Sequence, residues 1–173
     1  TTTTNPADMA KNYRLTADID VSDIWFNTPI GANAGGVFTG TFDGNGYAIS
    51  NLALASTSDD CSIFGHISRG TIKNLAIKNA VINGDQRYKM LFAVYAVGVT
   101  LENVYVELDI KTQGNFTGGI FYQMTEIYTN TFKNCIFNIK TDYSTATFYR
   151  GSLTGEASAP NTSKWENVYM IST

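Results

Sequence analysis

Five segments of the chain share one pattern of apolar and polar positions around a central asparagine. Each reads apolar, polar, Asn, apolar, any residue, apolar: ISNLAL (49–54), IKNLAI (72–77), LENVYV (101–106), FKNCIF (132–137) and WENVYM (165–170). The asparagines of these segments are Asn51, Asn74, Asn103, Asn134 and Asn167. Because strand-sized units that recur every ~20–50 residues are typical of stacked repeat folds, the pattern predicts a β-solenoid.

A phenylalanine repeats in a second apolar segment, once for each asparagine. The five phenylalanines are Phe38, Phe64, Phe92, Phe121 and Phe148. Each repeat is therefore expected to contain a Phe strand, a turn and an Asn strand. The predicted fold class is all-β, a parallel β-helix of about five coils with an internal asparagine ladder and a phenylalanine stack. The alternative is a β-sandwich whose asparagines occupy turns.

The alternation of inward and outward residues breaks at each asparagine. In IKNLAI, Ile72 is expected to face inward and Lys73 outward, as in any strand. Asn74 would then face inward, but the apolar residues that follow it also need the interior. Since asparagine tolerates left-handed backbone angles, a bend at Asn74 would reset the alternation. Amides on coils about 4.8 Å apart could then hydrogen-bond along the solenoid axis.

The residue before each asparagine is expected to point outward, and its charge alternates between repeats. These residues are Ser50, Lys73, Glu102, Lys133 and Glu166. Opposite charges on neighbouring strands attract one another, so the alternation favours this alignment of the repeats.

The composition excludes several function classes. The net charge is −3, and no cluster of Lys and Arg suits binding to nucleic acid. No apolar run approaches the ~18 residues that membrane insertion requires. The single histidine is His66, and Cys61 and Cys135 lack metal-ligand spacing and are expected to be free thiols. We therefore expect no cofactor.

Three strings near the start of the chain are distinctive: YRLTADID (13–20), FTGTFDGNGYAISNL (38–52) and SIFGHISRGTIKNLAI (62–77). On these residues the sequence resembles the GLUG-motif repeat family of bacterial surface proteins. The resemblance covers residues 12–82 and reaches the later repeats through their Phe and Asn positions. It implies a right-handed, pectate-lyase-like parallel β-helix within a secreted or cell-surface protein.

Parallel β-helices also carry polysaccharide lyases and hydrolases, so the charged residues around His66 need consideration. Asp59, Asp60, His66, Arg69 and Lys73 all fall within one predicted coil. An inverting hydrolase needs two carboxylates about 6.5–9.5 Å apart, and no neighbouring coil supplies acidic partners for this group. No catalytic residue is therefore predicted.

The string ADIDVSD offers a weak candidate calcium site. Its carboxylates belong to Asp18, Asp20 and Asp23, and oxygen ligands at this spacing could hold Ca²⁺. The loop lacks the glycine and the distal glutamate of an EF-hand, however. A solvated turn after the first strand is the favoured interpretation.

The variable segments that follow each Asn strand are expected to stack along one edge of the solenoid. They are residues 55–60, 83–89, 111–117 and 141–146. Aromatic rings beside amides and hydroxyls suit contacts with glycans or proteins. The candidate ligand-binding residues on or beside this edge are Arg87, Tyr88, Tyr122, Tyr143, Tyr149 and Arg150.

We interpret residues 1–11 as an N-terminal linker or cap and residues 12–173 as one β-helix domain, a fragment or module of a larger assembly. Because an uncapped solenoid exposes unpaired strands, an adjacent domain or subunit is expected at its C-terminal end. The predicted function is a non-catalytic structural or adhesive module of an extracellular or cell-surface protein, binding glycan or protein. Two alternatives remain open: a virion fibre or receptor-binding domain, and a polysaccharide lyase or hydrolase.

Overall fold

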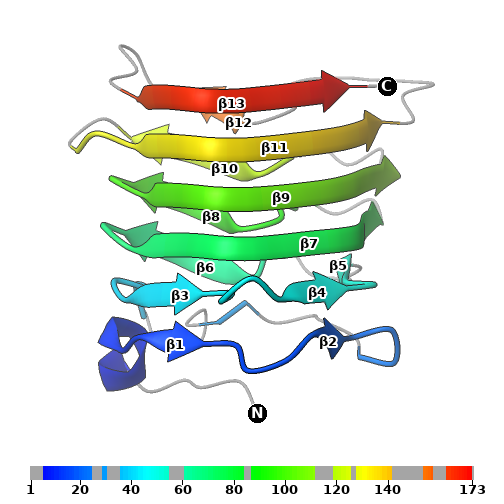
Figure 1. Cartoon of the computed structure of the whole chain (residues 1–173). Coiled ribbons are helices and arrows are strands. Elements are labelled where there is room, and N and C mark those ends of the chain that lie inside the picture. Colours follow the sequence, from blue (N-terminus) through cyan, green and yellow to red (C-terminus); the bar gives the residue numbers. More distant parts are fainter. Residues whose placement is uncertain are drawn as a thin grey trace.

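The chain folds as a parallel β-solenoid made of a long and a short sheet (Figure 1). The computed structural model describes residues 6–24, 29–30, 36–54, 61–83, 87–111, 119–125, 128–141, 154–157 and 163–172. A short 3-10 helix, η1 (Pro6–Ala10), precedes the first strand. The predicted all-β parallel architecture is confirmed.

The long sheet contains nine strands. They pair in the order β1-β3-β7-β9-β11-β13, and β2, β4 and β5 attach beside this path. The strands are β1 (Tyr13–Arg14), β2 (Ile19–Asp20), β3 (Thr41–Asp43), β4 (Ala48–Ser50), β5 (Ala53–Leu54), β7 (Thr71–Asn83), β9 (Thr100–Lys111), β11 (Thr131–Thr141) and β13 (Lys164–Ser172).

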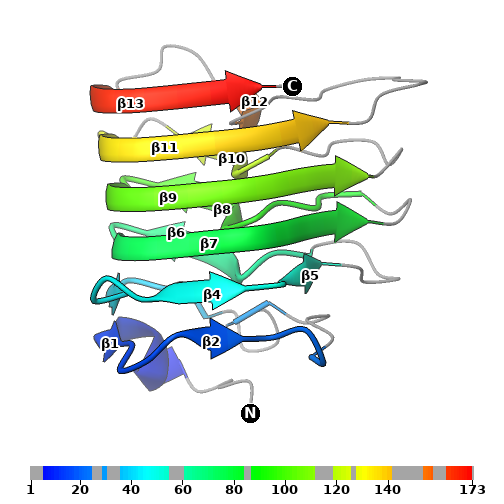
Figure 2. The ribbon, with the colours of Figure 1, turned by 45° about the vertical axis from the view of Figure 1, so that its right-hand side comes forward.

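The short sheet contains four strands, which pair in the order β6-β8-β10-β12. They are β6 (Phe64–Ser68), β8 (Ala93–Val97), β10 (Phe121–Thr125) and β12 (Thr154–Ala157). The chain therefore makes about four turns rather than the five predicted, with partial coils at both ends. In Figures 1 and 2 the long strands run from left to right in front. The chain returns from right to left behind them and rises by one coil each time, so the coil is right-handed.

A left-handed asparagine in each long strand produces the predicted reset of the alternation. Asn74 has a φ of 50°. Ile72 and Leu75 on either side of it are both buried, although two residues lie between them. Lys73 and Asn74 both lie on the outer face, so the strand keeps its apolar residues inside before and after the bend. The same conformation, with φ between 52° and 54°, recurs at Asn103, Asn134 and Asn167.

The amides of these asparagines form a ladder along the outer face of the long sheet. Each Nδ2 donates to the Oδ1 of the preceding coil: Asn103 to Asn74 (2.9 Å), Asn134 to Asn103 (3.0 Å) and Asn167 to Asn134 (3.1 Å). At the N-terminal end, Asn74 donates to Asp43 Oδ1 at 3.0 Å. The prediction of an internal ladder is wrong in this respect, because the bend turns the amides outward.

Asn51 belongs to a second, shorter ladder, so its predicted place in line with Asn74 is wrong. Its Nδ2 donates to Asp20 Oδ1 at 3.0 Å, and Asn79 Nδ2 donates to Asn51 Oδ1 at 3.3 Å. Asn79 is also left-handed, with a φ of 54°, and coincides with a register shift in β7. β7 therefore contains two bends, and ISNLAL aligns with the second of them.

A row of alternating charges runs beside the main ladder. The row is in register across six paired strands of the long sheet and comprises Arg14, Asp43, Lys73, Glu102, Lys133 and Glu166. Ser50 was expected in this row but lies opposite Lys78 instead. Asp43 takes its place, with its Oδ2 3.0 Å from Arg14 Nη2. At the other end, Lys133 Nζ lies 3.6 Å from Glu166 Oε1.

The phenylalanines pack as clusters within the core rather than as one continuous stack. Phe38 and Phe64 stack with ring centroids 4.5 Å apart, and the Phe92 and Phe121 centroids are 6.1 Å apart. The backbone register is offset, because Phe64 and Phe121 both pair with Ala93. Phe92 therefore lies one position out of line with its neighbours, and the rings tilt to stay in contact.

The last predicted phenylalanine, Phe148, lies outside the described residues. Thr154 of β12 pairs with Phe121 and takes the position that was expected for Phe148. The final turn is therefore longer than the phenylalanine spacing predicted. The long interval from Asn134 to Asn167 in the sequence agrees with this longer turn.

Both cysteines are buried and free, as predicted. Cys135 Sγ lies 3.3 Å from the carbonyl oxygen of Lys133, and burial raises the pKa of its thiol. Cys135 faces inward opposite Val168 of β13 and serves as a small core residue there.

We expect Asn103→Ala to lower the free energy of unfolding by about 2 kcal/mol, since it removes two ladder hydrogen bonds and leaves alanine in a left-handed conformation. Asn103→Gly should cost less, because glycine adopts a positive φ without strain. Urea unfolding of both variants measures the difference. Wild-type stability in both would contradict the structural role of the ladder.

Asp43 should make the fold sensitive to acid. Hydrogen bonds from Asn74 Nδ2 and the backbone N–H of Asn45, together with Arg14, lower the pKa of Asp43 to about 2. A lowered pKa stabilises the folded state above the ordinary value of 3.8, and this stabilisation is lost as the pH falls toward 2. Asp43→Asn should flatten the dependence of unfolding free energy on pH across that window. Urea titrations at several pH values test this, and an unchanged slope would count against it.

Candidate functional site

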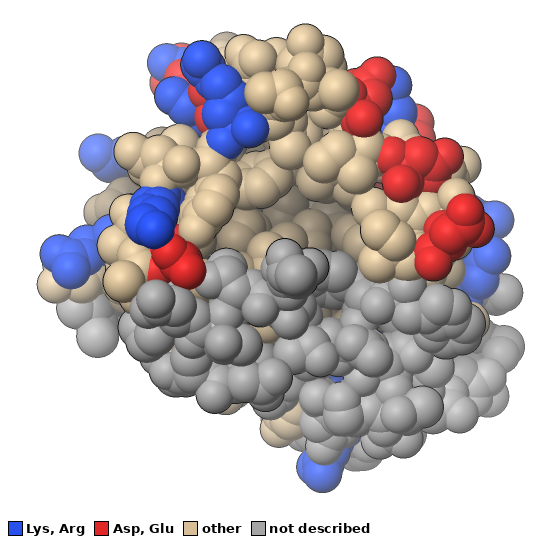
Figure 3. All heavy atoms as spheres, turned by 90° about the horizontal axis from the view of Figure 1, so that it is seen from below, with Lys and Arg blue, Asp and Glu red and all other residues tan. Residues whose placement is uncertain are grey.

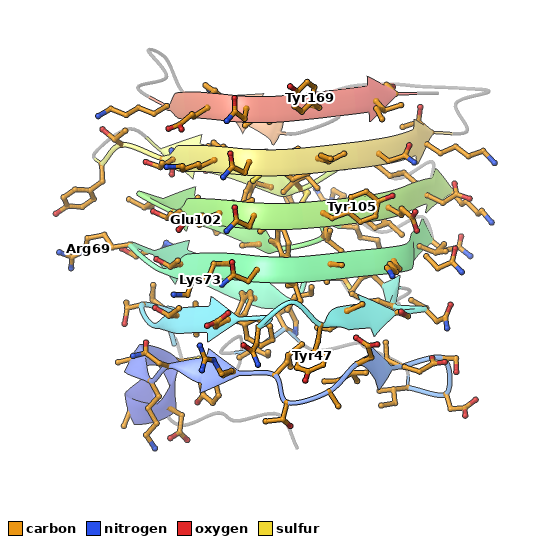
Figure 4. The ribbon with its side chains drawn as sticks, in the orientation of Figure 1. Tyr47, Arg69, Lys73, Glu102, Tyr105 and Tyr169 are labelled. Carbon is orange, nitrogen blue, oxygen red and sulfur yellow. The ribbon has the colours of Figure 1, made fainter. Side chains whose placement is uncertain are left out.

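The outer face of the long sheet carries a stripe of large side chains beside the asparagine ladder. Tyr105 on β9, Ile136 on β11 and Tyr169 on β13 lie in register, one coil apart. Each follows the ladder asparagine of its own strand by two residues. Ile136 is 39% exposed and Tyr169 is 62% exposed. Figure 4 shows Tyr105 and Tyr169 on one face, and the three residues are termed the Tyr105 stripe.

Polar side chains flank the Tyr105 stripe on both sides. The ladder amides lie on one side, and Glu107 and Asn138, which pair across β9 and β11, lie on the other. The hydroxyl of Tyr105 donates to Glu107 Oε1 at 2.6 Å, and this hydrogen bond raises the pKa of Tyr105. The bond also restricts the ring of Tyr105. An aromatic ring is thus held between amides and a carboxylate.

A groove of about 660 Å³ opens on the same face beyond Glu107. Asp109 Oδ2 lies 3.3 Å from Lys111 Nζ, while Asp109 Oδ1 is buried without a hydrogen-bond partner. Lys140 lies opposite Asp109 on the next strand. The polar lining of the groove comprises Asn51, Asn79, Glu107, Asp109, Lys111, Asn138 and Lys140.

This arrangement suits a ligand rich in hydroxyl groups. Carboxylates accept hydrogen bonds, ammonium groups donate them, and amides do both, so neighbouring hydroxyls of one sugar can all be satisfied. The exposed ring of Tyr169 and the half-buried ring of Tyr105 offer an apolar surface to the C–H face of a sugar. The Asp109 carboxylate adds a negative charge to the lining of the groove, opposite Lys140.

The structure places two of the six predicted edge residues in an apolar cluster. Tyr122 is buried and packs with Met90 and Val94, while the half-buried Tyr88 contacts its ring edge-on at 4.9 Å. These two tyrosines therefore serve a small apolar cluster. Arg87 beside them is exposed. The other three predicted residues, Tyr143, Tyr149 and Arg150, lie outside the described residues.

Two of the three candidate calcium ligands are used in hydrogen bonds. Asp18 Oδ1 accepts from the backbone N–H of Ala48 at 2.8 Å. Asp20 Oδ1 accepts from Asn51 Nδ2 and from the backbone N–H of Ser22, which lowers the pKa of Asp20. Asp23 lies in the turn after β2. Among the described residues, no group of three His, Cys, Asp or Glu side chains is placed to hold a metal ion.

The residues around His66 do not gather into one site within the described part of the chain. His66 lies on β6 of the short sheet and Lys73 on β7 of the long sheet. Arg69 lies in the turn between these strands (Figure 4). Asp59 and Asp60 lie outside the described residues. The Nε2 of His66 is buried without a hydrogen-bond partner, and burial lowers its pKa.

The Tyr105 stripe was not predicted from the sequence, although the repeat pattern contains a signal for it. The repeat pattern leaves one position free between its last two apolar residues, and Tyr105, Ile136 and Tyr169 occupy it in the last three repeats. A position that is free of the core but filled by large residues is a candidate contact surface. The groove could not be found this way, because it depends on the register of β4 and β5 against β7.

Comparison with known proteins gives one partial similarity. The chain is 37% identical over 95 residues to halomucin from Haloquadratum walsbyi, a match that covers 47% of this chain and 1% of halomucin. No protein-family model matches the chain, so the GLUG-motif assignment stays a prediction. No solved structure matches it either. Among the described residues, no helix has the length and apolar character needed to cross a membrane.

We expect His66 to titrate below its ordinary value of 6.5, because burial favours the neutral ring. Protonation then opposes folding, so stability present above pH 6.5 is lost as the pH falls through the lowered pKa. Since the chain has a single histidine, NMR can follow its ring signals directly. A measured pKa at or above 6.5 would contradict the burial of the ring.

Proposed function

We propose that this chain is a non-catalytic structural and adhesive module of a secreted or cell-surface protein, and that it binds glycan on the outer face of the long sheet. The observation that carries the proposal is the Tyr105 stripe, which lies between the asparagine ladder and the polar groove. The proposed binding site therefore lies on the sheet face and not on the loop edges that the sequence predicted. The burial of Tyr122 supports that change.

The sheet favours binding because its side chains are held in place before a ligand arrives. The ladder hydrogen bonds fix the strands in register, and the Glu107 carboxylate restricts the ring of Tyr105. A surface that is already ordered loses little conformational entropy on binding. Repetition along the axis also offers similar contacts at intervals of one coil, which suits an extended polysaccharide more than a single small molecule.

Two similarities support a location outside the cell. Halomucin is by its name a mucin, and mucins are extracellular glycoproteins; this chain is similar to a small part of it. The GLUG-motif resemblance of residues 12–82 points to bacterial surface proteins. A short solenoid stabilised by ladders of hydrogen bonds and charges would serve there as a rigid segment of a longer protein.

A glycan array probed with the whole chain tests the proposal, followed by calorimetric titration of the strongest polysaccharide. Tyr105→Ala should weaken binding roughly tenfold, which corresponds to ~1.4 kcal/mol, because it removes a ring face and the partner of Glu107. Asp109→Asn should weaken binding as well, since it removes a carboxylate charge from the lining of the groove and the partner of Lys111.

Tyr95→Ala is the matched control, because Tyr95 is 43% exposed but lies on β8 of the short sheet. It should leave affinity unchanged. Equal loss in Tyr105→Ala and Tyr95→Ala, or no binding to any glycan, would contradict the proposed face. Release of reducing or unsaturated ends from the bound polysaccharide would instead favour a hydrolase or lyase.

A further inference from the structure

The apolar columns of the core are uncovered at β13. Within the described structure, β13 pairs on one side with β11 and its other edge is unpaired. Phe132 and Phe137 on β11 are fully buried, whereas Trp165 and Met170 opposite them are 45% and 44% exposed. Trp165 stacks on Phe132 with ring centroids 4.2 Å apart, so one face of its indole is covered and the other is open.

The asparagine ladder is open in the same direction. Each ladder amide donates through Nδ2 to the preceding coil and accepts through Oδ1 from the following one. Asn167 donates to Asn134 at 3.1 Å, but none of the described residues donates to the Oδ1 of Asn167. A group that extends the ladder must therefore be a donor, and the amide of a further asparagine fits that geometry.

Besides apolar residues and a donor for Asn167, the row of charges sets a third requirement for a strand that pairs with β13. Signs alternate without interruption from Arg14 to Glu166, and Glu166 is the last member. Its partner on β11, Lys133, lies 3.6 Å away. A strand paired to the open edge in the same register places its own residue directly beside Glu166. A lysine or arginine there continues the alternation, whereas an acidic residue would repel.

The opposite end of the ladder already has its hydrogen-bond and charge partners, so the three requirements for an added strand apply only at β13. Asp43 terminates the ladder with a carboxylate, which accepts from Asn74 and from Arg14. Nearby, Met9 of η1 is buried, and its carbonyl oxygen accepts from the backbone N–H groups of Thr39 and Gly40. Figure 3 shows this end, with the charged side chains of the described residues along its rim.

We infer that the open edge of β13 binds a parallel strand of a further β-coil, and that this strand reads apolar, Lys or Arg, Asn, apolar, any residue, apolar opposite Trp165 to Met170. The apolar residues cover the core columns, the basic residue faces Glu166, and the asparagine donates to Asn167 Oδ1. This inference does not depend on the proposed glycan-binding face, although Tyr169 of that face lies on the same strand.

A second copy of the chain fits less well. Its β1 would place Tyr13 beside Trp165 and Arg14 beside Glu166, which satisfies the apolar and charge columns. The next residue is Leu15, which offers no side-chain donor to Asn167. The amide requirement therefore favours a coil that carries the asparagine.

The test appends a copy of residues 112–141 to the C-terminus of the whole chain. This copy carries β10 and β11, and its Phe132, Lys133 and Asn134 meet the required pattern. Trp25→Phe leaves Trp165 as the single tryptophan, because the chain has two and the copy has none. Binding of the copy should raise the melting temperature, shift Trp165 emission to the blue and reduce its quenching by acrylamide severalfold.

Two controls change only the appended copy: Lys133→Glu, which places an acid beside Glu166, and Asn134→Ala, which removes the ladder donor. Each should give a lower melting temperature and stronger quenching than the unchanged copy. The inference is overturned if all three chains behave alike, or if the unchanged copy leaves Trp165 as accessible as in the unextended chain. Concentration-dependent self-association of the unextended chain that shields Trp165 would identify a second copy as the occupant and overturn it too.

Discussion

The left-handed asparagine is the constraint on which the rest of this structure depends. It adds one outward residue to a strand without moving the apolar residues that follow it, so the strand stays buried on both sides of the bend. An alanine could fill the space but would be strained there, and glycine would fit the backbone without offering an amide. Asparagine meets both needs, and stacking it in register links neighbouring coils through their side chains.

The repeat pattern predicted the solenoid and most of the ladder because both follow from local chemistry. Asn74, Asn103, Asn134 and Asn167 each stand between residues whose burial can be judged from the sequence. The predicted alignment of Asn51 with Asn74 was wrong because β7 contains a second left-handed asparagine, Asn79, with which Asn51 aligns. The sequence pattern alone does not show which of these two asparagines is the partner of Asn51. In the first position of the main ladder, where the amide of Asn51 was expected, the acceptor is the carboxylate of Asp43. A pattern defined by asparagine cannot reveal that an aspartate takes this position.

The candidate site was harder to predict for a different reason. A binding face on a solenoid is formed by residues from successive coils, so it depends on the register between strands far apart in sequence. Tyr105, Ile136 and Tyr169 come together only because their ladder asparagines align. The predicted tyrosines were chosen for their place near loops, and burial of Tyr122 beside Met90 and Val94 shows that a loop-adjacent ring can belong to the core.

The uniform direction of the ladder gives the molecule an electrical polarity. Every amide points its N–H₂ toward the first coil and its carbonyl toward the last, so the small dipoles add, as the peptide dipoles of an α-helix do. The partial positive pole then lies at Asp43, whose negative carboxylate neutralises it in the manner of a helix N-cap. At the far pole, partial negative charge gathers on Asn167 next to the full negative charge of Glu166. The two ends of this solenoid are therefore electrostatically unlike, and a stack of such modules would carry a built-in sense of direction.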